Sequence, residues 1–317
     1  MDKPPALLDW LRSGQRDVYL FGTCLLDLFW PEAGEDTATL LERNGLRWHY
    51  PQGQSCCGQP AYTSGQRASA RAVARAQLDL FPQPWPVIVP SGSCAGMISQ
   101  HWPGLFEGEA DEAQALGVAQ RTIELGTFLN AWWWPVHGMP GAERPRGGEG
   151  APRDQAMAAP SEAPSHQASP CRVALHTSCS ARREVDMRRH GTQVLDQLPG
   201  VHRVEHPQEA ECCGFGGVFS LKHPDISGAM VQDKLAHLVS VRPRCVVSAD
   251  AGCLLNLKHA HEAQREQDPL GCLPMSFQHL ASFLLTQLPP MPQAGDAPAG
   301  AEPPAHSDAR LTAPPSP

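Results

Sequence analysis

Two pairs of adjacent cysteines are the residues of this chain whose types and spacing could do chemistry. Each pair is followed by glycine. An isolated cysteine precedes each pair, with 31 or 32 residues between, and another follows it after a gap of 36 or 39. Eight of the eleven cysteines therefore form a duplicated pattern. Its members are Cys24, Cys56, Cys57 and Cys94 in the first copy and Cys179, Cys212, Cys213 and Cys253 in the second.

Adjacent thiols on one tight turn are poorly placed to bridge each other, but both can face one metal centre. Four thiolates suit a soft metal, either zinc or the iron of an iron–sulfur cluster. Structural zinc sites draw their ligands from short Cys-x2–4-Cys knuckles. Only the central pair is local here, so the spacing favours iron and leaves zinc as the alternative. A third interpretation, eight apolar buried thiols, does not explain why the pattern occurs twice.

Other polar residues near these cysteines could take part in the chemistry. His176 could bind the metal or donate a proton, and Asp27 or Asp250 could accept one. Arg182 and Arg183 could together hold an anionic substrate. We expect plainer roles for all five: a partly buried histidine at a strand end, solvated or capping carboxylates, and a solvated helix face.

Three cysteines stand outside the pattern. Cys245 lies in a strand-like run, and we expect it in the core. Cys171 and Cys272 border less ordered segments, where a free surface thiol or a small buried one is the default.

The elements around the cysteines follow the same order in the two halves of the chain. Short apolar runs predict strands, and periodic apolar positions predict helices. In the first half the predicted strands span residues 18–24, 46–50 and 87–89, and the helices span 33–43 and 68–80. In the second half the strands span 172–176, 201–204 and 245–248, and the helices span 184–198 and begin again at Pro224.

Strands that alternate with helices predict parallel sheets built from βαβ units. In such sheets functional sites form in the loops beyond the carboxyl ends of the strands, where these cysteines fall. The sequence therefore predicts an α/β fold with two pseudo-symmetric cysteine-rich domains. We expect a first domain at 17–138, a Pro/Gly/Ala-rich disordered linker at 139–170, a second domain at 171–288 and a disordered tail at 289–317.

The composition of the whole chain excludes several classes of function. A net charge of −8 argues against a nucleic-acid surface. No apolar run approaches the roughly 20 residues that a membrane-spanning helix needs, and no signal-type segment follows the N-terminus. No Gly-x-Gly-x-x-Gly fingerprint for a flavin or nicotinamide nucleotide occurs. We therefore expect a cytoplasmic protein, in which clustered cysteines are metal or redox ligands rather than disulfides.

The motifs around the cysteines resemble those of the lactate utilization protein A family, over about residues 17–285. This family belongs to the CCG-domain proteins, which include the cysteine-rich subunit of heterodisulfide reductase and the iron–sulfur subunits of glycolate oxidase and anaerobic glycerol-3-phosphate dehydrogenase. The matching strings are Ser55-Cys56-Cys57-Gly58-Gln59-Pro60-Ala61-Tyr62, Pro90-Ser91-Gly92-Ser93-Cys94, His176-Thr177-Ser178-Cys179, Cys212-Cys213-Gly214-Phe215-Gly216-Gly217 and Asp250-Ala251-Gly252-Cys253.

The resemblance implies an iron–sulfur protein, with one or two clusters of the [4Fe–4S] kind held by the eight cysteines. It implies a cytoplasmic complex that oxidises L-lactate, a small hydroxyacid, to pyruvate. The implied partners are a ferredoxin-type iron–sulfur subunit and a third small subunit. In the heterodisulfide reductase branch each half ends in Cys-x-x-Cys, whereas Met97 and Asn256 occupy the last position here. This departure speaks against five-thiolate clusters and leaves four thiols for each half.

Three hypotheses for the function follow. The first is an electron-transfer subunit whose clusters accept electrons from lactate or relay them between partner subunits. The sequence does not show which subunit oxidises the hydroxyacid. The second keeps the clusters in a glycolate, glycerol-3-phosphate or heterodisulfide-type oxidoreductase. The third is a zinc-stabilised scaffold that only assembles partners.

Overall fold

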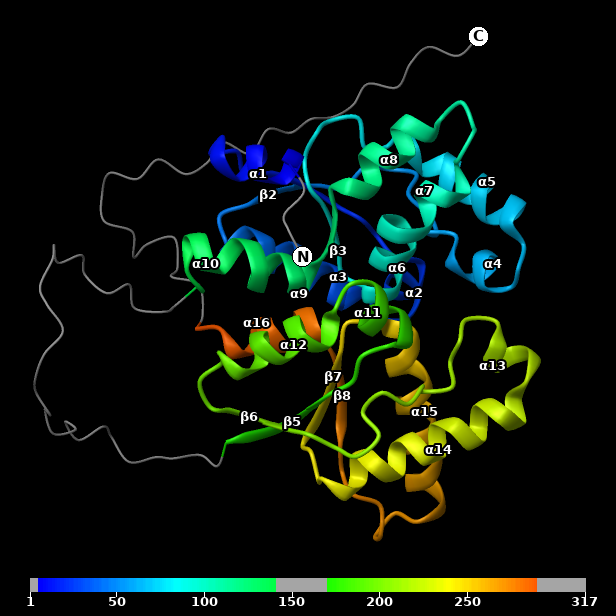
Figure 1. Cartoon of the computed structure of the whole chain (residues 1–317). Coiled ribbons are helices and arrows are strands. Elements are labelled where there is room, and N and C mark those ends of the chain that lie inside the picture. The colour runs from blue at the N-terminus through cyan, green and yellow to red at the C-terminus, as the bar shows by residue number, and fades with distance from the viewer. Residues whose placement is uncertain (1–4, 141–169, 290–317) are drawn as a thin grey trace, which may run out of the picture.

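The computed structural model describes residues 5–140 and 170–289, which form two four-stranded sheets with helices around them (Figure 1). The predicted α/β fold with two related parallel sheets is therefore confirmed. Nearly all of the predicted linker at 139–170 and tail at 289–317 lies outside the described residues, so these two assignments stay predictions. Within the described ranges, no helix has the length and apolar character needed to cross a membrane.

The strands of the first half are β1 (Asp17–Leu20), β2 (Arg47–His49), β3 (Val87–Val89) and β4 (Thr122–Glu124). The strands of the second half are β5 (Cys171–Leu175), β6 (Val201–Val204), β7 (Cys245–Ser248) and β8 (Ser276–His279). The helices of the first half, two of them π-helices labelled η, are α1 (Pro5–Arg12), α2 (Cys24–Phe29), α3 (Pro31–Arg43), α4 (Gln59–Thr63), α5 (Arg67–Leu78), α6 (Gly92–Gly96), η1 (Met97–His101), α7 (Trp102–Leu105), α8 (Glu112–Gln120), α9 (Leu125–Thr127), η2 (Phe128–Trp133) and α10 (Trp134–His137). The helices of the second half are α11 (Cys179–Glu184), α12 (Met187–Asp196), α13 (Phe219–Lys222), α14 (Pro224–Ser240), α15 (Ala251–Gln267) and α16 (Leu280–Gln287).

The two sheets have the same topology. Their strand orders are β2-β1-β3-β4 and β6-β5-β7-β8, and every pairing is parallel. In such a sheet the chain leaves the two central strands in opposite directions, which opens a crevice at their carboxyl ends. Cys24 and Cys94 follow the central strands β1 and β3, and Cys179 and Cys253 follow β5 and β7. In each half, the two isolated cysteines therefore lie at the same end of the sheet, beyond the carboxyl ends of its central strands.

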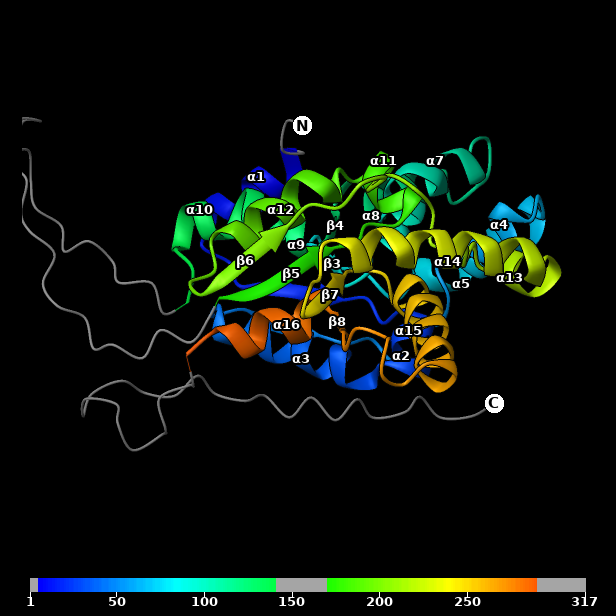
Figure 2. The same cartoon turned by 90° about the horizontal axis from the view of Figure 1, so that it is seen from below.

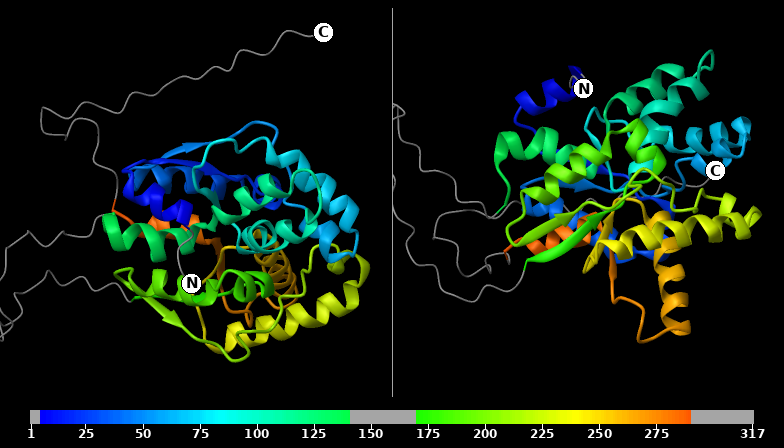
Figure 3. Two further views of the ribbon diagram at one scale, coloured as in Figure 1. Left: turned by 45° about the horizontal axis from the view of Figure 1, so that its top comes forward. Right: turned by 60° about the horizontal axis from the view of Figure 1, so that its bottom comes forward.

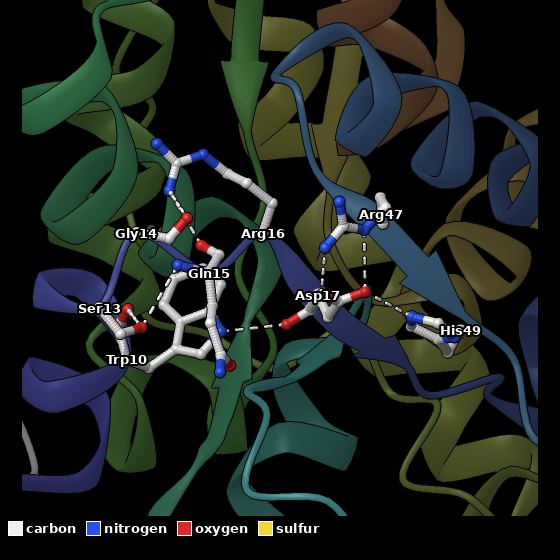
Figure 4. Close-up of polar contacts among 8 residues, drawn as sticks. All are labelled: Trp10, Ser13, Gly14, Gln15, Arg16, Asp17, Arg47 and His49. Carbon is white, nitrogen blue, oxygen red and sulfur yellow. Dashed lines mark hydrogen bonds and ion pairs between the residues drawn. The ribbon is translucent and has the colours of Figure 1, made fainter. Parts of the chain in front are cut away.

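Figure 4 shows the polar contacts of Asp17, the first residue of β1. Asp17 is at the amino end of this strand, whereas Cys24 follows its carboxyl end. Arg47 donates from Nε and Nη2 to the two carboxylate oxygens of Asp17, at 3.0 and 2.6 Å. The Nε2 atom of His49 lies 2.9 Å from Oδ1, and the Trp10 indole donates to the Asp17 carbonyl at 3.1 Å. The Arg47 guanidinium holds the pKa of the Asp17 carboxyl below its usual range. Because Asp17 also pairs with Arg47 in the ladder, these contacts support the register of β2 on β1.

The two halves pack against each other through corresponding helices. Helix α3 lies along α16 of the other half, as Figure 2 shows, and α12 lies against α9 and η2. The helices that carry the isolated cysteines also meet across the boundary, α6 with α11 and α2 with α15. One apolar cluster contains residues of both halves, among them Val18, Leu40, Phe128, Leu195 and Leu284. The halves therefore share a core, and Figure 3 gives two further views of their arrangement.

Gly92 shows how closely α6 approaches α11. A Cβ atom at this position would lie 2.3 Å from the Cβ of Ala181, which is shorter than any real contact. Replacing Gly92 by alanine is expected to lower the free energy of unfolding by about 1–3 kcal/mol, as overpacking does in other cores. Urea denaturation of the metal-free protein measures this loss. Adding Ala181→Gly should recover part of it, and a double variant no more stable than Gly92→Ala would contradict this contact.

Candidate metal centres

The four cysteines of the first pattern come together beyond the carboxyl ends of β1 and β3. The Sγ atoms of Cys24 and Cys56 lie 3.7 Å apart, and those of Cys57 and Cys94 lie 3.3 Å apart. The side chains of the adjacent residues Cys56 and Cys57 also interact, which joins these two contacts into one group. Cys57 and Cys94 are buried, whereas Cys24 and Cys56 are half-buried.

The second pattern forms a matching group beyond β5 and β7. The Sγ atoms of Cys213 and Cys253 lie 2.9 Å apart, and the side chain of Cys212 interacts with those of Cys179 and Cys213. The inner two thiols are again buried and the outer two half-buried. The structure thus brings all eight predicted ligands together, four in each half.

Glycine allows the tight turn at each pair. Gly58 and Gly214 have φ angles of 90° and 82°, in the left-handed region that glycine adopts without strain. A Cβ atom on Gly214 would lie 2.6 Å from the carbonyl oxygen of Ser227. The backbone N–H groups of the two glycines donate to the Sγ atoms of Cys56 and Cys212, each at 3.4 Å. Each turn therefore directs a hydrogen-bond donor at a thiolate, an interaction that tunes iron–sulfur centres.

One thiol of each pair is stabilised as a thiolate. A hydrogen bond from Cys24 is the main reason that the pKa of Cys56 falls to about 3. A hydrogen bond from Cys179 likewise lowers the pKa of Cys212 to about 2. The pKa values of Cys24 and Cys179 rise, because each shares its proton with the neighbouring thiolate. Each group thus already holds one negative charge that a metal cation would neutralise.

These pKa values predict selective alkylation of the metal-free protein. At about pH 5 an ordinary thiol is protonated and unreactive, because the thiolate is the nucleophile. Iodoacetamide is therefore expected to modify Cys56 and Cys212 first, which mass spectrometry of the digested protein would show. Cys171 is the control, since it is also half-buried but stands outside the pattern. Equal modification of Cys171 and Cys56 would contradict the thiolate assignment.

In each half, a buried polar side chain on the second helix after the cysteine pair bonds to the loop just before that pair. In α5, Gln77 donates to Ser55 Oγ at 2.8 Å and accepts from the Ser55 N–H at 3.0 Å. In α14, Lys234 donates from Nζ to the carbonyls of Gln208 and Glu209, at 3.1 and 3.0 Å. Burial lowers the pKa of Lys234 to about 8. A cation therefore supports the second loop where a neutral amide supports the first.

His176 differs from its sequence-based expectation. It is 1% exposed rather than partly buried, and it directly follows β5. One of its ring nitrogens and the Sγ atoms of Cys213 and Cys253 all lie within 4.8 Å of one another. Burial lowers the pKa of His176 to about 3, so the imidazole is neutral. The second group therefore contains a nitrogen donor in addition to its four thiols.

Asp250 also differs from expectation, whereas Asp27 is exposed as predicted. Asp250 is buried, and its Oδ1 accepts hydrogen bonds from the Ser91 hydroxyl at 3.1 Å and the Ser93 N–H at 2.9 Å. Ser91 directly precedes α6 and Ser93 lies within it, and α6 is the helix that carries Cys94 in the other half. This carboxylate therefore joins the two halves between their cysteine groups.

The two arginines after Cys179 have different surroundings. Arg183 is exposed, as predicted for a solvated helix face. Arg182 is instead turned inward and forms an ion pair with Glu209 at 3.4 Å. Glu209 also pairs with Arg188 at 2.6 Å. The prediction of a solvated pair was therefore wrong for Arg182.

The positions of the missing fifth thiols have other contacts. Met97 is fully buried in the core shared by the two halves. The side-chain amide of Asn256 donates to the carbonyl of Cys213 at 2.7 Å. In the first half the Trp102 indole makes the corresponding bond, to the carbonyl of Cys57 at 3.0 Å. Asn256 therefore fixes the turn of the second pair through the backbone.

The three cysteines outside the pattern stand apart from both groups. Cys245 is buried on β7, as predicted for a core thiol. Cys171 and Cys272 are half-buried, and the Sγ of Cys272 lies 3.6 Å from the Nε2 of His261. The donor sets of the two groups, four convergent thiols in each, fit a soft metal or an iron–sulfur cluster.

Comparison with known proteins shows a close relationship. The CCG family, described as a cysteine-rich domain, matches residues 18–99 and 173–258. Lactate utilization protein A of Geobacillus kaustophilus (strain HTA426) is 35% identical over 241 residues, 76% of this chain and 89% of that protein. The protein of that name from Geobacillus sp. (strain WCH70) is 33% identical over 268 residues, 84% of this chain and 98% of that protein. Lactate utilization protein A 2 of Bacillus cereus (strain Q1) is 31% identical over 247 residues, 76% of this chain and 88% of that protein.

Proposed function

Because this chain belongs to the lactate utilization protein A family of CCG cysteine-rich domain proteins, we propose that it is the iron–sulfur subunit of a cytoplasmic complex that oxidises L-lactate to pyruvate. The gathering of eight sequence-distant cysteines into two groups of four carries this proposal. All eleven cysteines are free thiols, which is typical of a reducing compartment.

We assign one centre to each half. The ligands would be Cys24, Cys56, Cys57 and Cys94 in the first and Cys179, Cys212, Cys213 and Cys253 in the second. An iron–sulfur cluster, of the [4Fe–4S] kind in our proposal, would supply reversible one-electron transfer. The protein holds the sulfurs on two glycine turns and directs the N–H groups of Gly58 and Gly214 at them.

The contact between the halves suits a relay of electrons. The four helices that carry the isolated cysteines meet in pairs across the boundary. Asp250 of the second half also accepts a hydrogen bond from the backbone N–H of Ser93, in the helix that carries Cys94 in the first half. The two centres are therefore kept in a fixed relation, as electron transfer between them would require.

Partners complete the proposed system. The family relationship favours a ferredoxin-type iron–sulfur subunit and a third small subunit, with lactate as the substrate of the assembly. In this role the chain is an oxidoreductase subunit that carries electrons. The hydroxyacid chemistry could then take place in any subunit that binds lactate.

Growth of a gene-deletion strain tests the assignment of the substrate. Loss of the protein is expected to abolish growth on L-lactate and to leave growth on glycolate and on glycerol intact. A plasmid copy with Cys213→Ser should fail to restore growth on lactate, whereas a copy with Cys245→Ser should restore it. Normal growth of the deletion strain on L-lactate, with a defect on glycolate or glycerol, would favour the second hypothesis instead.

A further inference from the structure

We propose that His176 is a ligand of the second centre, so that the two centres differ in their donor sets. This inference rests on the proposed function, since it concerns iron held by the second group of cysteines. It assigns a nitrogen ligand to that centre.

The position of the imidazole is the first observation. One ring nitrogen of His176 lies beside the Sγ atoms of the two buried thiols, Cys213 and Cys253. These three atoms are all within 4.8 Å of one another. All three residues are buried. The position is fixed by the fold, because β5 ends at the residue before His176 and the backbone N–H of His176 donates to the Val247 carbonyl of β7 at 2.8 Å.

The unsatisfied hydrogen-bonding capacity of the imidazole is the second observation. Neither Nδ1 nor Nε2 of His176 has a hydrogen-bond partner among the described residues. A buried polar group left without a partner is destabilising. With both ring nitrogens free of protein partners, a neutral imidazole at this position can direct a nitrogen lone pair at a metal, as a metal ligand must.

Comparison of the halves is the third observation. Phe21 occupies the corresponding place, three residues before Cys24, and it is fully buried with its ring stacked on Phe81. In the described part of the first half, no histidine or carboxylate joins the cysteines in a comparable group. The duplicated fold thus places an apolar ring at one centre and an imidazole at the other.

The alternative donor at the second centre is already engaged. Asn256 stands at the position of the missing fifth thiol, but its amide donates to the Cys213 carbonyl. His176 precedes the first cysteine of the pattern, whereas Asn256 follows the last, and neither ring nitrogen of His176 has a hydrogen-bond partner among the described residues. His176 is therefore the side chain available as a nitrogen donor beside these thiols.

Isotope labelling of the wild-type protein tests this inference directly. Anaerobically purified, iron-loaded full-length protein is prepared with 14N- or 15N-histidine and poised where its centres are paramagnetic. Pulsed EPR is expected to show a hyperfine coupling typical of a directly bound imidazole nitrogen, which changes with the isotope. His176→Phe, which copies the first half, should abolish this coupling.

Two matched variants identify the source of the signal. His206→Gln removes another buried histidine, whose Nδ1 already lies 2.8 Å from the Pro207 carbonyl. Phe21→Leu changes the corresponding position of the first half. Both should retain the nitrogen coupling of the wild type.

The outcomes separate the inference from the proposed function. Iron-loaded wild-type protein without a histidine coupling, or with only the weak coupling of a hydrogen bond, overturns the ligand assignment and leaves the proposed function intact. A coupling that survives in His176→Phe overturns it as well. Protein that contains no iron contradicts the proposed function itself, and the inference with it.

Discussion

Replacing Cys213 by serine is expected to remove about half of the iron bound to the protein, because a serine hydroxyl is a poor ligand for a soft metal. Cys213 is 2% exposed and lies at the centre of its group, where its side chain interacts with those of Cys253 and Cys212. Cys213 does not belong to the first group of cysteines, so the first centre should keep its iron. Iron analysis and EPR of the purified variant measure both effects.

Matched variants show whether this loss is specific. Cys57→Ser should remove the other half of the iron, and the double variant should lose nearly all of it. Cys245→Ser is the control, because Cys245 is equally buried but lies outside the pattern. Full iron content in Cys213→Ser, or loss of both centres at once in a folded protein, would contradict two independent groups of ligands.

Replacing Asp250 by alanine is expected to lower the free energy of unfolding by about 3 kcal/mol, because two hydrogen bonds to a buried carboxylate are lost. The Ser91 hydroxyl and the Ser93 N–H would both lose their acceptor. The start of α6, the helix that carries Cys94, should loosen as a result, although Asp250 belongs to the other half. Urea denaturation of the metal-free protein measures the change in stability.

Three further variants measure how much each contact of Asp250 contributes to this loss of stability. Asp250→Asn keeps one acceptor oxygen and should lose less stability than Asp250→Ala. Ser91→Ala removes only the hydroxyl contact and is expected to cost about 1 kcal/mol. Asp27→Ala changes an exposed carboxylate and should have little effect. If Asp250→Ala is no less stable than Asp27→Ala, Asp250 does not hold the halves together.

The central elements of the fold could be predicted from the sequence because their patterns are local. Apolar runs and the helix-ending Asn44-Gly45 placed the central strands and α3 close to their observed bounds. The outer strands β4 and β8 were missed, since each has only three or four residues of mixed polarity. The shared core was missed as well. It depends on contacts such as that of Gly92 with Ala181, which leave no periodic pattern in the sequence.

The candidate site also has parts that the sequence predicts and parts that it does not. The duplicated spacing was enough to predict which cysteines group together, because each loop follows a strand end of a parallel sheet. The role of a single polar side chain depends on contacts far along the chain. Nothing near Asp250 in the sequence shows that it bonds to Ser93, and nothing near His176 shows that it lacks a partner. The proximity of His176 to Cys179 was the available signal, and it did not distinguish a ligand from a packed ring.

Analysis of the metal content of the anaerobically purified wild-type protein tests the central claim most directly. Iron, acid-labile sulfide and zinc are measured on the same sample, together with its EPR spectrum before and after reduction. We predict iron and sulfide in similar amounts, little zinc, and signals from centres in both halves. Stoichiometric zinc without iron or sulfide would contradict the assignment of the eight cysteines to electron transfer.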